Sequence, residues 1–192
     1  MTVHHCSFSW VVCAALMTTI PCIARHSAAA DNAQTMARVR SSDRSIVELI
    51  ERATHHSPTL DKLIGRVETS NGIVYVEPGI CPQRVPACLK VWMVTTGSVR
   101  FMRIVVDRHQ LDSDSTLLGA IGHELQHAIE VLSDPTVTDS NKMFFFYRRY
   151  APTQRDQFET WAAVSAGDAV QHELRNWRGK ASSVDPPYAR PF

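Results

Sequence analysis

The clearest chemical pattern in the sequence is the five-residue run HELQH, from His123 to His127. Two histidines four positions apart lie on one face of a helix, about one turn apart, so both imidazoles can reach one metal ion. The glutamate between them lies beside that ion, where it can take a proton from bound water and deliver it to a leaving group. We therefore predict that His123 and His127 bind Zn²⁺ and that Glu124 is the catalytic base.

The surroundings of this run bear on whether it is a metal site or a pair of unrelated surface histidines. A match to H-E-x-x-H arises by chance in roughly one sequence in fifty of this composition, so the match alone is only a hypothesis. The run lies inside a stretch without proline, and an apolar face formed by Ile121, Leu125 and Ile129 lies beneath it. This context favours the metal site.

A catalytic zinc site takes three protein ligands, so one more ligand must come from elsewhere in the chain. The arrangement H-E-x-x-H-x-x-G-x-x-H is excluded, because Glu130 and Ser133 occupy its glycine and last histidine positions. We predict that Glu159, near the start of the last helix, is the third ligand. Asp168 and Glu173 are the alternatives for this role.

Two further features concern the helices that would form the site. Glu130 lies one turn beyond His127 and is better placed to support that histidine than to bind the metal. Small residues would let the last helix pack tightly against the histidine helix, namely Ala162, Ala163, Ala166 and Gly167. Without a metal, Glu159 would be a carboxylate favoured by the dipole at a helix N-terminus.

At these residues the chain resembles the zincin metallopeptidases, and more narrowly the gluzincins, in which a glutamate on a following helix completes the H-E-x-x-H site. In several such families the second helix reads E-x-x-A-D. Glu159 and Ala162 match this pattern, whereas Ala163 stands where an aspartate would orient a metal-binding histidine. The orienting partner must then be another acid, such as Asp168, or a backbone carbonyl.

The resemblance covers His123 to His127 and Glu159 to Gly167, under a quarter of the mature chain. It implies Zn²⁺, an attacking water, and hydrolysis of a peptide bond in a peptide or protein substrate. Such enzymes need a donor that faces the developing negative charge. The candidates are Tyr147, Arg148, Arg149, Tyr150 and His172. An extended substrate would pair with an edge strand expected at Gly97 to Arg103.

Two other functions remain open. The first is a zincin-like module that binds zinc for a structural or regulatory purpose and has little hydrolytic activity. The alanine at position 163 favours this reading, whereas Glu124 argues against it, because a structural site needs no general base. The second is an interaction domain without a metal, which requires the histidine pair to be accidental.

The elements that would position these residues follow from apolar periodicity and turn residues. The predicted helices cover 45–53, 58–65, 115–132 and about 155–177, with 136–154 irregular or briefly helical. The predicted strands are 66–70 and 73–77, which flank a hairpin turn at Asn71-Gly72, and 89–95 and 98–106, which flank a turn around Gly97. We expect an α+β fold, zincin-like, with a small, mostly antiparallel sheet of three to five strands packed on helices.

The amino terminus has the features of a targeting segment. Phe8 to Ile20 is a run of 13 residues without charge. That is too short to span a bilayer, which takes about 20 residues, but it suits a secretory signal. We predict a signal peptide over 1–30, a linker over 31–42, a single domain over 43–180 and an extended tail over 181–192. The expected location is the periplasm or the exterior, with no stable membrane anchor after processing.

Composition and cysteine content limit the remaining possibilities. Cys81 and Cys88 would remain after processing, and an even pair in an exported chain predicts a disulfide. Lys and Arg number 20 against 19 Asp and Glu, which argues against the basic stripe that nucleic-acid binding requires. Hydrophobic residues make up 44% of the chain, enough for a substantial core.

Overall fold

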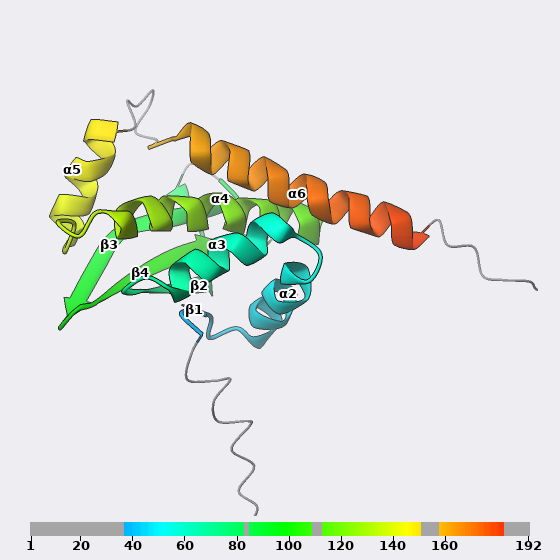
Figure 1. Cartoon of the computed structure of the whole chain (residues 1–192), viewed down its shortest axis with the longest axis horizontal. Helices are drawn as coiled ribbons and strands as arrows, with labels where there is room; N and C mark the ends of the chain where they lie inside the picture. The colour runs from blue at the N-terminus through cyan, green and yellow to red at the C-terminus, as the bar shows by residue number, and fades with distance from the viewer. Residues whose placement is uncertain (1–36, 83–84, 109–112, 151–157, 183–192) are drawn as a thin grey trace, which may run out of the picture.

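The computed structural model describes residues 37–82, 85–108, 113–150 and 158–182 (Figure 1). Its helices are α2 (Arg44–Thr54), α3 (Pro58–Glu68), α4 (Asp114–Ser133), α5 (Ser140–Tyr150) and α6 (Trp161–Ser182). Its strands are β1 (Val39–Arg40), β2 (Gly72–Pro78), β3 (Ala87–Thr96) and β4 (Val99–Val106). The predicted α+β class is confirmed for this part of the chain.

The four strands form one mixed sheet in the order β1-β2-β4-β3. The pairs β1–β2 and β2–β4 are parallel, and only β3–β4 is antiparallel. The prediction of a mostly antiparallel sheet is therefore wrong. Part of the predicted linker is also structured, because Val39 and Arg40 form β1 and pair with Val74 and Tyr75.

The hairpin expected at Asn71-Gly72 does not form, because α3 continues through Gly65 to Glu68. Val67 is fully buried and extends the apolar stripe of Leu60 and Leu63 by one more turn. Its burial stabilises a helix at these residues rather than a strand. A Cβ on Gly72 would collide with the side chain of Leu132. This glycine therefore permits close approach of β2 to α4 instead of making a turn.

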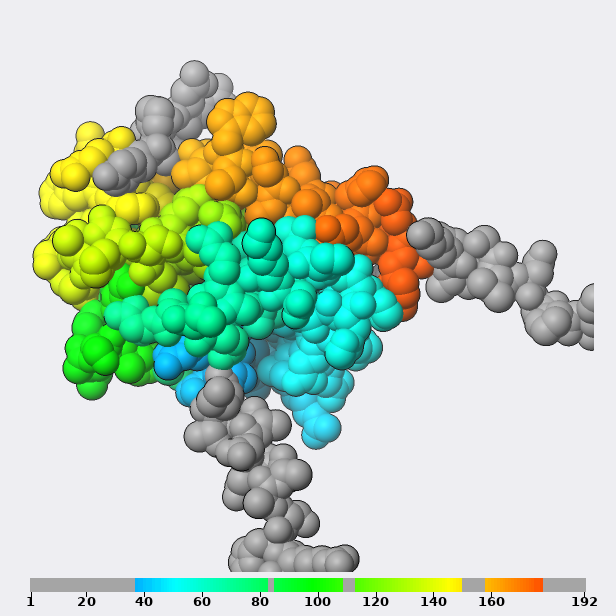
Figure 2. Space-filling model, viewed as in Figure 1, coloured from blue at the N-terminus to red at the C-terminus, as the bar shows by residue number. Residues whose placement is uncertain are grey.

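The helices stack in layers on one face of the sheet. Helix α4 contacts β2, β3 and β4, and α6 packs on α4 (Figure 1). The space-filling view shows α3 and α4 side by side, with α6 along their upper border (Figure 2). The sheet contributes fully buried side chains to the core, among them Val74, Val76, Met102 and Ile104. Facing them, α4 contributes Ile121 and Leu125, also fully buried.

Glycines allow α4 and α6 to approach closely. A Cβ on Gly167 would lie 3.0 Å from both the Gly119 carbonyl oxygen and the His123 Cβ. Ala163 and Ala166 are buried in the same contact, as the small residues predicted, whereas Ala162 is exposed. The backbone of α6 therefore runs directly beside the proposed metal-binding face of α4.

Helix α6 begins later than the sequence predicted. Residues 158–160 are not helical, and the Thr160 hydroxyl accepts a hydrogen bond from the Ala163 N–H at 3.1 Å, as an N-cap does. Glu159 therefore precedes the helix instead of lying in it. The helix also continues past Gly179 to Ser182, into the first residues of the predicted tail.

Some predictions fall outside the described residues. These are the signal peptide over 1–30 with its cleavage site, and the tail from 183 onward. Within the described part of the chain, the search for a membrane-crossing helix finds none with the required length and apolar character.

Candidate metal centre

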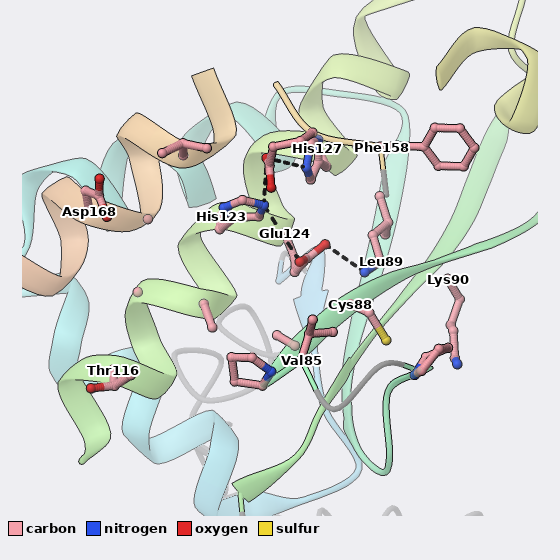
Figure 3. A pocket seen from close by; sticks show the side chains of 18 of the residues that line it. Val85, Cys88, Leu89, Lys90, Thr116, His123, Glu124, His127, Phe158 and Asp168 are labelled. Carbon is pink, nitrogen blue, oxygen red and sulfur yellow. Dashed lines mark hydrogen bonds and ion pairs between the residues drawn. The ribbon is translucent and has the colours of Figure 1, made fainter. Parts of the chain in front are cut away.

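The nitrogens of two α4 histidines face one carboxylate from the segment before α6. His123 Nε2 lies 3.2 Å from Glu159 Oε1, and His127 Nε2 lies 3.6 Å from the same oxygen. One ligand atom from each residue lies within 4.8 Å of the other two. The structure thus brings together the three residues that the sequence predicted as ligands (Figure 3).

The donor set and its spacing fit a small divalent cation. Ligands at about 2.1 Å from a tetrahedral zinc ion lie about 3.4 Å from one another. The distances of 3.2 and 3.6 Å from the carboxylate oxygen to the two ring nitrogens match that edge length. Two imidazole nitrogens and one carboxylate oxygen are also ligand types that divalent transition metals take.

Glu124 lies next to these atoms and is held by the sheet. Its Oε1 is 4.0 Å from His123 Nε2, and its Oε2 accepts a hydrogen bond from the Leu89 N–H of β3 at 2.7 Å (Figure 3). Burial raises the pKa of this carboxyl, although the two histidines and the Leu89 N–H act in the opposite direction. A raised pKa suits a group that takes up a proton and later returns it.

Glu130 orients His127 from one turn further along α4. Its Oε2 lies 3.1 Å from His127 Nδ1, in agreement with the predicted supporting role. Burial disfavours the charged ring, but hydrogen bonds with Glu130 and Glu159 outweigh it and raise the pKa of His127 to about 9. A carboxylate that accepts Nδ1–H orients the ring so that Nε2 points toward Glu159, and a metal ion bound there would displace the Nε2 proton.

The alternative ligands lie elsewhere. Glu173 accepts hydrogen bonds from the Ser57 hydroxyl at 2.5 Å and the Thr59 N–H at 3.1 Å, at the start of α3. Asp168 is exposed on α6 and lies apart from the group of His123, His127 and Glu159 (Figure 3). It is also not the partner of His127, because Glu130 has that role.

Of the predicted oxyanion donors whose side chains the structure describes, only Tyr147 lines the cavity beside the site, and its hydroxyl already has a partner. Tyr147 is buried, and its hydroxyl donates to the His127 carbonyl at 2.9 Å, so it supports the backbone of α4. Arg148 and Arg149 are exposed on α5, and His172 is exposed on α6 beside Asn176. The side chain of Tyr150 lies outside the described residues.

A cavity of about 600 Å³ opens in front of these groups. One wall comes from α4 and α6, and the other comes from residues 85–91, at the start of β3 and just before it. A disulfide between Cys81 and Cys88, with Cα atoms 5.9 Å apart, closes the loop that leads into this wall. The edge strand beside the site is therefore β3, and the expectation of an edge at Gly97 to Arg103 is wrong because β4 lies inside the sheet.

Sequence reasoning missed three supporting groups. The Leu89 N–H is a backbone donor and leaves no signal in the residue type. Thr160 and Tyr147 contact the site only because α5 and the segment before α6 fold back onto α4. The position of Thr160 directly after the predicted ligand Glu159 could have indicated that it lies near the site.

Comparisons with protein-family models, characterised proteins and solved structures find no match to this chain. The arguments for function therefore rest on the geometry of the site.

Proposed function

We propose that this chain is a zinc-dependent hydrolase, and more specifically an exported metallopeptidase of the zincin type. The observation that carries the proposal is the convergence of His123, His127 and Glu159 within 4.8 Å, with Glu124 beside them. A structural zinc site is usually closed by four protein ligands, whereas the described residues supply three here, and the site opens into a cavity.

The residues of the site divide into holding and reacting groups. A zinc ion held by the three ligands would lower the pKa of water to about 7 and polarise a substrate carbonyl. Glu124 takes the proton of the attacking water and delivers it to the leaving amine. The Leu89 N–H keeps the carboxylate of Glu124 aimed at the cavity during both transfers.

A peptide substrate is supported by the wall of the cavity. Leu89, Lys90 and Val91 of β3 line it, and among the described residues no strand lies beyond β3. The Leu89 N–H is bonded to Glu124 and the Met93 N–H to the Ser140 hydroxyl. An extended peptide would therefore add to this edge around Val91, where it passes in front of Glu124.

The first experiment measures metal content and turnover together. We expect the purified protein to contain about one zinc per chain by elemental analysis and to cleave fluorescently labelled casein. Glu124→Gln should keep the zinc and lose turnover by at least about 100-fold, because the amide cannot accept the proton. The exposed Glu48→Gln on α2 is the control for removal of a carboxylate and should leave both values unchanged.

Other outcomes would contradict parts of this proposal. Full turnover in Glu124→Gln would remove the mechanism. Zinc binding without hydrolysis in the wild type would instead support a structural or regulatory metal-binding module, for which the alanine at position 163 is the supporting observation. Iron in place of zinc would reassign the site, since two imidazoles and a carboxylate also suit that metal.

Export is a separate part of the proposal. It rests on the uncharged run from Phe8 to Ile20 and on the bonded cysteine pair. Sequencing the amino terminus of the protein recovered outside the cytoplasm should give Asp31 as the first residue. Recovery of the uncleaved chain in the cytoplasm would contradict this part alone.

A further inference from the structure

The third ligand needs an anchor that α6 does not supply. Glu159 lies in a non-helical stretch, and 51% of its side chain is exposed. Both of its neighbours are anchored: the Phe158 ring stacks on Tyr147 at 5.4 Å, and the Thr160 hydroxyl donates to Glu130 Oε1 at 2.7 Å.

The two residues that anchor these neighbours, Tyr147 and Glu130, also contact His127. Glu130 uses its second oxygen for His127 Nδ1, and Tyr147 donates its hydroxyl to the His127 carbonyl. The same two residues thus hold one histidine on α4 and the chain on either side of Glu159. Because Glu130 bonds His127 and Thr160 through different oxygens, its carboxylate sets the spacing between these two parts of the site.

We propose that Thr160 is a positioning residue of the metal centre, which holds Glu159 at binding distance from His127 through Glu130. This inference rests on the proposed metal site. The hydroxyl serves both elements, since it donates to Glu130 and accepts from the Ala163 N–H that starts α6.

The test asks whether the Thr160 hydroxyl sets the zinc affinity and whether loss of a helix cap elsewhere has the same effect. Thr160→Val keeps the shape of the side chain and removes the hydroxyl, whereas Thr160→Ser restores it. Ser113→Ala is the matched control, because Ser113 caps α4 through the Thr116 N–H and makes no contact with Glu130. Zinc affinity is measured by competition with a chromogenic chelator, and Co²⁺ absorption reports the coordination geometry.

We expect Thr160→Val to weaken zinc binding about 10–100-fold, the usual effect of losing a group that supports a ligand. Its Co²⁺ spectrum should also change. Thr160→Ser should restore the wild-type affinity and spectrum, and Ser113→Ala should keep both while losing stability. Wild-type affinity in Thr160→Val, or failure of the serine to restore it, would overturn the inference.

A double-mutant cycle keeps the test decisive if Thr160→Val folds poorly. Glu130→Gln can accept from His127 through its one carbonyl oxygen, but it then turns an N–H toward Thr160 in place of an acceptor. The affinity losses of Thr160→Ala and Glu130→Gln should therefore not add in the double variant, because both changes break the same link. Additive losses, or wild-type affinity in Glu130→Gln, would overturn the inference.

The proposed function fails in a different way from this inference. If the wild type binds no zinc, or if His127→Ala binds as tightly as the wild type, the metal site itself is wrong. If the wild type binds zinc tightly, His127→Ala does not, and Thr160→Val equals the wild type, the metal site stands and the positioning role of Thr160 is wrong.

Discussion

Glu159 is the least enclosed of the three proposed ligands. Its side chain is 51% exposed, against 22% for His123 and 5% for His127. The histidines are positioned by the helix and by core packing, whereas Glu159 depends on its two anchored neighbours. At the scale of single residues, the metal affinity should therefore respond most clearly to changes at Glu159.

Glu159→Ala should weaken zinc binding by more than the about 10–100-fold typical of supporting residues, because a direct ligand is lost. Asp168→Ala is the matched control. Asp168 lines the same cavity but is not one of the three grouped ligand residues. Chelator competition measures both affinities. Equal affinities for Glu159→Ala and the wild type would show that another group completes the site.

At the scale of elements, α4 is held at its carboxyl end by a buried arginine. Arg100 of β4 is 3% exposed and donates to the carbonyls of Val131 and Leu132 in the last turn of the helix. It also donates to the carbonyls of Asp134 and Val137 in the segment that follows. The guanidinium thus satisfies the carbonyl groups that a helix end leaves unpaired, in the region where a positive charge is most favourable.

Arg100→Met should lower the free energy of unfolding by about 3 kcal/mol or more, because several buried carbonyls lose their donor. Arg103→Met is the control on the same strand. Arg103 is exposed and stacks over Trp92 at 5.2 Å, so its loss should cost about 1 kcal/mol or less. Urea denaturation measures both values. Similar losses in the two variants would contradict the role given to Arg100.

The contact between α6 and the start of α3 should make stability depend on pH. Burial alone would raise the pKa of Glu173, but the hydrogen bonds from Ser57 and Thr59 together outweigh it, so the pKa lies below its usual 4.5. Its contribution is fully present above the unfolded pKa and is lost as the pH falls through the lower folded pKa. Below about pH 4.5, Glu173→Gln should therefore lose less stability than the wild type. Parallel stability curves for the two proteins would contradict this.

At the scale of the whole molecule, the site depends on α4 lying between the sheet and α6. The sheet supplies the Leu89 N–H that holds Glu124, and the segment before α6 supplies Glu159. The Cys81–Cys88 disulfide immediately precedes Leu89 and closes the loop that leads into one wall of the cavity. The loop, the sheet and the proposed catalytic base Glu124 are therefore connected.

Replacing both cysteines by serine should lower the free energy of unfolding by about 2 kcal/mol, the loop-closure value for a ring this short. Turnover should fall as well, because the loop before Leu89 gains freedom. Zinc affinity should stay at the wild-type value, since none of the three ligands lies in this loop. Denaturant unfolding, casein cleavage and chelator competition check the three parts. Unchanged stability would contradict the account of the disulfide.

Several features could be predicted from the sequence because they depend on local patterns. The apolar stripe around Leu125 predicted a long helix, and α4 runs from Asp114 to Ser133. The strands around Gly97 also form, and this glycine has a φ of 60° that suits the turn. The hairpin at Asn71 was wrong because the dipeptide signal competed with the burial of Val67 on α3, which only tertiary contacts reveal.

By itself, the sequence determined that His123 and His127 share one helical face with Glu124 between them, because helix geometry converts four positions into one turn. Only the tertiary structure decided the rest. It placed Glu159, and not Asp168 or Glu173, beside the two histidines, put β3 at the edge beside the cavity, and connected Glu130 to Thr160. These choices join segments distant in sequence, and their relative positions depend on packing, such as the approach of α6 to the glycines of α4, which no local pattern encodes.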